Sequence, residues 1–135
     1  ERTMDYLKEL FTFALTLRDK SSGDRYSILI REAKDYIAEN YGNSEFSLNM
    51  IAGYIGVSPS YFSSIFKQGT GQSFIEYLTK ARIDRACELL KCTNLRTSEI
   101  GEKVGYNDPH YFSATFKKIM GQSPKEFRNN TAQDS

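Results

Sequence analysis

The stretch YFSSIFKQGTGQS, Tyr61–Ser73, returns fifty residues later as YFSATFKKIMGQS, Tyr111–Ser123. In each copy two phenylalanines lie four residues apart, a spacing that places both on one face of a helix. Each copy is preceded by a polar residue and a proline, Ser58-Pro59 and Asp108-Pro109, the pattern of an N-cap followed by the first helical position. The chain therefore repeats one helical unit.

A short segment with helical apolar spacing precedes each copy and ends at a glycine. These segments are Ser47–Gly56 and Thr97–Gly105, and a glycine suits the left-handed C-cap of a helix. A short helix, a turn of about three residues and a second helix form a helix-turn-helix. The sequence thus predicts two such units, at about residues 47–69 and 97–120.

A long central helix is predicted between the two units, from about residue 73 to 91. Its apolar residues occur on more than one side: Phe74, Tyr77, Leu78, Ala81, Ile83, Ala86, Leu89 and Leu90. A helix wetted on one side only would not need this pattern. We therefore expect an all-α fold in which two helix-turn-helix subdomains share one buried helix.

The N-terminal part predicts two further helices. Apolar spacing over Tyr6–Leu17 indicates a connector helix within residues 1–25, which DKSSGD at 19–24 should end. Either it arrives from an upstream domain, or its apolar face forms a dimer seam.

The second helix should run over Ser27–Asn40, with Ile28, Ile30 or Arg31, Tyr36 and Ile37 on its buried side. At the other end, residues after Arg128, and 131–135 in particular, are expected to form a polar tail.

Composition limits the possible classes of function. With 135 residues, 39% of them hydrophobic, the chain is large enough for one compact domain but not for a large sheet enzyme. Its longest apolar run, Phe11–Leu17, is far below the roughly 18 residues of a membrane span. Cys87 and Cys92 lie on different sides of the predicted helix and should not pair, which fits a reducing cytoplasm. With His110 as its single histidine, the chain offers no zinc set, and we expect no metal or cofactor.

The distribution of charge favours nucleic acid as the partner. The net charge is only +1, but acidic residues are absent from 46–75 and from 109–125, where the two copies lie. An outward carboxylate beside phosphates would weaken binding, and two like helices suit successive major grooves, which recur every ~34 Å. A duplicated protein-interaction module with a merely solvated serine face is the alternative. An enzyme is not expected, because no catalytic set occurs and GTGQS is too short for a phosphate loop.

The two copies also resemble a known family. GVSPSYFSSIFKQGTGQSFIEYLTKARIDRACELL, followed by TSEIGEKVGYNDPHYFSATFKKIMGQSPKEFR, is similar to the DNA-binding domain of AraC/XylS-type bacterial transcription regulators over about residues 26–129. The resemblance implies a seven-helix unit that inserts both recognition helices into adjacent major grooves and activates or represses transcription. The base-contact positions that it implies are Ser60, Ser63, Ser64, Lys67, His110, Tyr111, Ala114 and Lys117.

Two of these positions depart from the family pattern. Ser64 and Ala114 stand where family members often have Arg or another long polar side chain. Serine makes one bond where arginine grips guanine with two, and alanine offers thymine only a methyl group. We therefore expect weaker direct base contact, with DNA shape, bridging water or an upstream dimer supplying the rest. His110 is either a contact or plain surface.

Phosphate contacts are expected where backbone N–H groups point outward at helix starts, and at two cations. The helix starts lie near Ser58, Ser73, Asp108 and Ser123. The cations are Lys118 and Arg82, although Arg82 is equally well explained as a structural residue of the long helix.

The first residue is Glu1 rather than Met, so we expect this chain to be a fragment with a sensor upstream. The connector helix and the general style of the sequence look like response regulators of two-component systems, in which the upstream domain is a receiver. A ligand-binding β-barrel sensor is the alternative. Double-stranded DNA, RNA polymerase, the upstream domain and a second copy of the chain are the expected partners.

Overall fold

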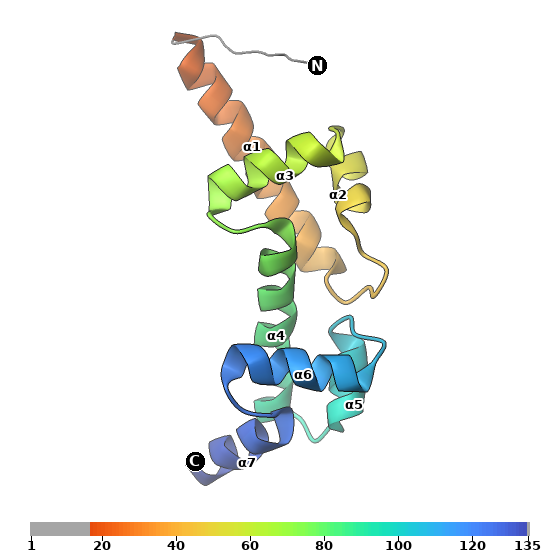
Figure 1. Ribbon diagram of the computed structural model, residues 1–135. Coiled ribbons are helices and arrows are strands. Elements are labelled where there is room, and N and C mark those ends of the chain that lie inside the picture. The colour runs from red at the N-terminus through yellow and green to blue at the C-terminus, as the bar shows by residue number, and fades with distance from the viewer. Residues whose placement is uncertain (1–16, 135) are drawn as a thin grey trace.

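The computed structural model describes residues 17–134. Within that range the chain forms seven helices and no strand: α1 (Leu17–Asn40), α2 (Leu48–Ile55), α3 (Pro59–Thr70), α4 (Phe74–Cys92), α5 (Thr97–Lys103), α6 (Pro109–Met120) and α7 (Pro124–Asp134). Helices α1 to α3 gather around one half of α4, and α5 to α7 around the other half (Figure 1). The predicted all-α architecture with two helix-turn-helix units is confirmed.

Polar caps set the helix starts at the predicted residues. Three serine hydroxyls accept a hydrogen bond from the backbone N–H three residues on: Ser47 for α2, Ser58 for α3 and Ser73 for α4. The carboxylate of Asp108 accepts from the N–H of His110 at the start of α6. At α7, Ser123 accepts from the N–H of Glu126, whose carboxylate accepts from the Ser123 N–H in return. Each cap contributes about 1 kcal/mol.

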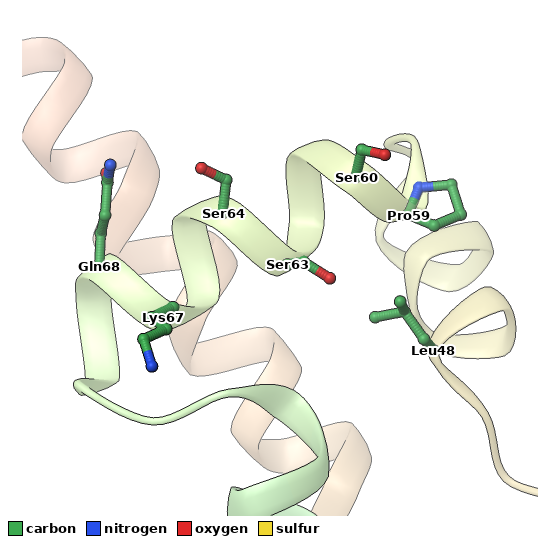
Figure 2. Close-up of a pocket in the computed structure, with 7 residues that line it drawn as sticks. All are labelled: Leu48, Pro59, Ser60, Ser63, Ser64, Lys67 and Gln68. Atoms are coloured by element: carbon green, nitrogen blue, oxygen red, sulfur yellow. The ribbon is translucent and has the colours of Figure 1, made fainter.

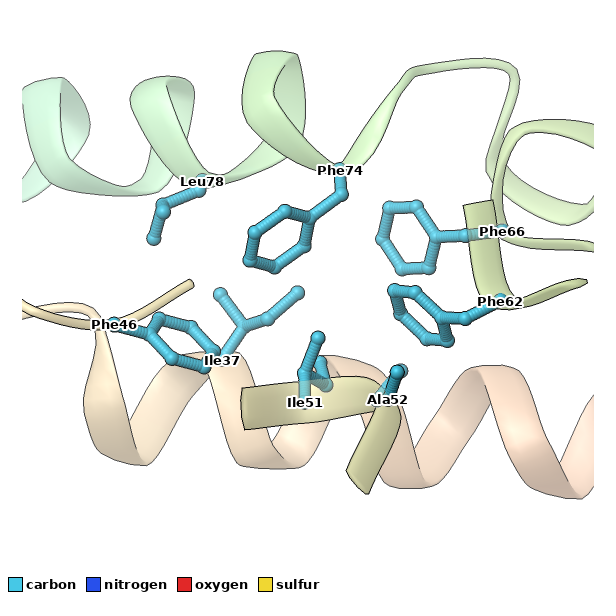
Figure 3. Packing of buried hydrophobic residues seen from close by; sticks show 9 residues of the cluster. Ile37, Phe46, Ile51, Ala52, Phe62, Phe66, Phe74 and Leu78 are labelled. Atoms are coloured by element: carbon cyan, nitrogen blue, oxygen red, sulfur yellow. The ribbon is translucent and has the colours of Figure 1, made fainter. Parts of the chain in front are cut away.

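The central helix α4 divides the apolar interior into two clusters. Figure 3 shows the first cluster. The first half of α4 contributes Phe74 and Leu78 to a cluster with Ile37, Phe46, Ile51, Ala52, Phe62 and Phe66. The second half contributes Ile83, Ala86, Leu89 and Leu90 to a cluster with Ile100, Val104, Tyr106, Phe112 and Phe116. This explains why α4 is apolar on more than one side, since each half serves a different cluster.

The repeated phenylalanines are fully buried members of each cluster. Phe62 and Phe66 of α3 are 1% and 0% exposed, and Phe112 and Phe116 of α6 are both 0% exposed. Phe74 stands nearly edge-on to Phe62, with ring centroids 6.1 Å apart. Because both helices bury the same positions, they must also present the same positions outward.

Two helix boundaries differ from the prediction. Helix α1 runs unbroken through residues 19–24, where the sequence predicted an end. That segment contains no proline, and a single glycine costs a helix interior only about 1 kcal/mol. The rest of the predicted connector helix, residues 6–16, lies outside the described range. Helix α7 continues to Asp134, through most of the expected tail.

Some burial predictions were also wrong. Ile28 on α1 was expected inside, but it is 52% exposed. Helical spacing from Phe112 and Phe116 would also place Ile119 of α6 inside, yet Ile119 is 46% exposed. On α1 the fully buried Ala33, not counted in the sequence pattern, sits one turn before the buried Ile37. On α6 the neighbouring Met120 packs against the second cluster instead. In each helix a small or flexible side chain, Ala33 or Met120, packs inside, whereas the isoleucine that helical periodicity favoured is exposed.

Candidate nucleic-acid interface

The outer face of α3 forms an open groove with a volume of about 580 Å³. Its lining consists of Leu48, Pro59, Ser60, Ser63, Ser64, Lys67 and Gln68 (Figure 2). All four positions implied for the first recognition helix are therefore together on one surface. Gln68 was not among the predicted base contacts. It lies one helical turn beyond Ser64, so helical spacing alone places it on the same face as Ser64.

The groove has two rows of side chains. In Figure 2, Ser64 and Gln68 project to one side of α3, whereas Ser63 and Lys67 project to the other. Ser60, Ser64, Lys67 and Gln68 are exposed, and Ser63 is half-buried. Small hydroxyl side chains at the centre leave the α3 backbone able to approach a ligand closely.

Helix α6 presents the same register. Like α3 it has twelve residues, begins at a proline and ends at a glycine with φ of 80°. Its outward side chains are all exposed: His110, Tyr111, Ala114, Lys117 and Lys118. Tyr111 is 62% exposed, and its ring lies 5.8 Å from that of the buried Tyr106. The structure thus brings the second set of predicted positions to one surface as well.

The two outer faces carry only positive formal charge. Neither α3 nor α6 contains an acidic residue, and their last turns hold Lys67, Lys117 and Lys118. An anionic polymer therefore meets no carboxylate on either helix. Tyr61 on α3 is 44% exposed and corresponds to Tyr111. Only Tyr111 was predicted as a base contact, and the fifty-residue offset was the signal that could have pointed to Tyr61.

The helix starts are less uniform than the sequence predicted. At Ser73 and Ser123 the backbone N–H is taken by a glutamate, Glu76 or Glu126, at 2.8 Å. That N–H lowers the pKa of each glutamate, and the charges of nearby lysines add to the effect. Asp108 likewise places its own carboxylate at the start of α6. Ser58 caps α3 without a charge, so that helix start keeps its positive character for a phosphate.

Arg82 takes the structural alternative. Its Nε donates to the carbonyl oxygen of Tyr41 at 2.8 Å, and its Nη2 donates to that of Asn43 at 3.1 Å. Its guanidinium carbon lies 5.3 Å from the centre of the Tyr106 ring. Burial lowers the pKa of Arg82, although a guanidinium keeps its charge in proteins. With two of its five N–H donors directed at main-chain carbonyls, Arg82 has the structural role that was the alternative to a phosphate contact.

Other kinds of site have no support in the described part of the chain. Among the residues whose side chains the structure describes, 25–131, no group of three or more His, Cys, Asp or Glu side chains could hold a metal ion. Residues 17–134 contain no helix that is long and apolar enough to cross a membrane. Cys87 is half-buried and Cys92 exposed, both as free thiols.

Comparison with known proteins identifies the duplicated unit. The profile of a family described as a helix-turn-helix domain matches residues 51–130, from the middle of α2 into α7. The chain belongs to the AraC-type helix-turn-helix family. AraC-type domains are DNA-binding domains of transcription regulators, and the family is not one of enzymes.

Three relatives illustrate the similarity. The arabinose operon regulatory protein of Escherichia coli is 38% identical over 99 residues, 73% of this chain and 34% of that protein. YesN of Bacillus subtilis, an uncharacterized transcriptional regulatory protein, is 38% identical over 113 residues, 81% of this chain and 31% of that protein. The C-terminal domain of AraT, a response regulator from Geobacillus stearothermophilus, is 45% identical, with a TM-score of 0.74 over 76% of this chain and 84% of that one. The chain thus spans about a third of the length of these two curated AraC-type relatives.

Proposed function

We propose that this AraC-type domain binds double-stranded DNA with α3 and α6 in successive major grooves on one face of the duplex. The observation that carries the proposal is that α3 and α6 bury phenylalanines at equivalent positions. Both helices therefore turn equivalent faces outward, and neither face contains an acidic residue. In Figure 1, α3 and α6 run in the same direction, α3 across α1 near the start of α4 and α6 across α4 itself. Two like helices held on one central helix match two like grooves that recur every ~34 Å.

Within this interface we assign base contacts and phosphate contacts to different residues. The assigned base contacts are Ser60, Ser63, Ser64, Lys67 and Gln68 on α3, and His110, Tyr111, Ala114 and Lys117 on α6. The phosphate contacts are Lys118 and the N-terminus of α3, whose cap Ser58 carries no negative charge that would compete with a phosphate. Because most of the base contacts are short side chains, DNA shape and bridging water carry a larger share of the specificity.

We further propose that the domain is the output domain of a response regulator. The support is its 45% identity to the C-terminal domain of a response regulator. An upstream receiver would then dimerise the full-length protein, and bound RNA polymerase would be the target of regulation. A ligand-sensing regulator is the second candidate, favoured by the 38% identity to the arabinose operon regulatory protein.

Selection from a randomised duplex pool tests DNA binding. We expect an enriched sequence with two boxes whose centres lie about 10 bp apart. Affinity for that duplex should fall by roughly 0.9 log units per phosphate contact for each log unit of salt. A protein-interaction module, the competing hypothesis, would enrich no sequence and would show no such salt dependence.

A further inference from the structure

The side chain of Arg82 touches both halves of the fold at once, where the first unit comprises helices α1–α3 and the second unit helices α5–α7. Its Nε and Nη2 hold the carbonyl oxygens of Tyr41 and Asn43, in the turn between α1 and α2 of the first unit. Its guanidinium also faces Tyr106, which is 6% exposed and belongs to the apolar cluster of the second unit. The two units are therefore joined by a second link, besides the covalent path along α4.

Two glycines show that the main chains of the units approach closely at this link. A Cβ on Gly105 would lie 2.5 Å from the Tyr41 carbonyl oxygen and 2.6 Å from Arg82 Nε. A Cβ on Gly42 would lie 2.9 Å from the carbonyl oxygen of Lys103, at the end of α5. We call the contact formed by Tyr41–Asn43, Arg82 and Gly105–Tyr106 the inter-unit joint.

The joint is connected to the recognition helix of the second unit. The Tyr106 ring lies 5.5 Å from that of the buried Phe112 and 5.8 Å from that of the exposed Tyr111, both on α6. On the other side, Tyr41 packs against the first cluster, which holds α3 through Phe62 and Phe66. Rotation of one unit about α4 would therefore break the hydrogen bonds or the ring contact of Arg82.

Arg128 provides a matched arginine that stays within one unit. Its Nε, Nη1 and Nη2 donate to the carbonyl oxygens of Leu90, Leu95 and Thr93, at 3.0, 2.7 and 3.0 Å. Both arginines thus hold carbonyl groups in the last turn of a helix or just after it, at the end of α1 for Arg82 and at the end of α4 for Arg128. A planar guanidinium suits this role because several donors share one fixed fork. Of these two arginines, only Arg82 makes a contact that crosses between the units.

We propose that Arg82 is a positioning residue that fixes the angle between α3 and α6 and thereby selects one spacing of the two DNA boxes. The inference rests on the proposed binding to two successive grooves. One extra base pair between the boxes moves the second box by about 3.4 Å along the duplex and about 35° around it. With a rigid joint, α3 and α6 cannot both reach their boxes after this displacement, and affinity falls. With a loosened joint the two units can reorient, so that both helices still bind.

Spacing profiles of four proteins test this role. The wild type, Arg82→Gln, Arg82→Lys and Arg128→Gln are titrated against the selected two-box duplex, against duplexes with one base pair added or removed between the boxes, and against single-box duplexes. We expect the wild type to lose about tenfold in affinity for each one-base-pair change, a penalty set by strain in protein and DNA. For Arg82→Gln the loss should be under about threefold, with single-box affinity unchanged.

The two further variants separate positioning from stability. Arg82→Lys should give an intermediate profile, because one ammonium group cannot replace a fork of donors; it carries the test if Arg82→Gln does not fold. Arg128→Gln should lower the midpoint of thermal unfolding and keep the wild-type spacing profile. The inference would be overturned if the Arg82 variants kept a spacing profile as sharp as that of the wild type, or if Arg128→Gln broadened the profile as much as Arg82→Gln. Either result would leave the two-groove proposal standing. A wild type without any preferred spacing would overturn the two-groove proposal and this inference with it.

Discussion

Replacing Gly105 by alanine should destabilise the domain far more than the same change at its counterpart Gly56. Both glycines follow the first helix of a helix-turn-helix unit and have positive φ, 107° and 93°. At either site the left-handed conformation costs alanine about 1–2 kcal/mol. At Gly105 the new methyl also meets the Tyr41 carbonyl and Arg82, whereas at Gly56 nothing lies within 4 Å.

The added clash sets the size of the difference. Overpacking costs about 1–3 kcal/mol, so Gly105→Ala should lower the free energy of unfolding by about 2–5 kcal/mol and Gly56→Ala by about 1–2 kcal/mol. Urea denaturation followed by circular dichroism measures both values in one experiment. Equal losses at the two positions would refute the close approach of the two units at Gly105, since only that approach distinguishes the two glycines.

The remaining predictions concern the interface and the caps. Replacing Lys118, an assigned phosphate contact, by alanine should weaken binding to all duplexes alike and reduce the salt slope by about 0.9; an anisotropy titration over a salt series measures this, and an unchanged slope would contradict it. Ser63→Ala or His110→Ala should instead alter the sequence preference at a few base pairs in a repeated selection. If both variants keep the wild-type preference, the base contacts must lie elsewhere. The pKa of Glu126 is lowered in the folded state by the Ser123 N–H, so its contribution to stability is present above the ordinary glutamate pKa and is lost as the pH falls through the lowered one. The difference in unfolding free energy between wild type and Glu126→Gln should therefore vanish in acid, and a difference that persists there would exclude the carboxylate as its source.

Much of the fold followed from local sequence signals. The caps at Ser58, Ser73 and Asp108 depend on a residue and its next few neighbours, and such short-range chemistry can be recognised without a structure. Each phenylalanine pair was placed on one helix face for a similar reason, since a spacing of four residues matches one face. The break predicted at residues 19–24 failed because polar residues and one glycine disfavour a helix only weakly.

The role of Arg82 could not be settled from the sequence. Its acceptors are carbonyl groups of Tyr41 and Asn43, about forty residues away, and main-chain acceptors leave no trace in residue identity. The same holds for Gly105, whose partner across the joint is again a carbonyl oxygen. Conversely, Glu76 was near enough to Ser73 for a capping box to be recognised, and it would have removed that helix start from the phosphate candidates.

Affinity cleavage tests the two-groove account most directly. Single cysteines are introduced at the equivalent exposed positions Gln68 on α3 and Lys118 on α6, in a protein whose Cys87 and Cys92 have been replaced, and each carries a tethered iron chelate that cuts nearby DNA. On the selected duplex the two proteins should cut around centres about 10 bp apart on the same face of the helix. Cutting by only one of the two proteins, or two centres on opposite faces of the duplex, would contradict the claim that α3 and α6 occupy successive major grooves.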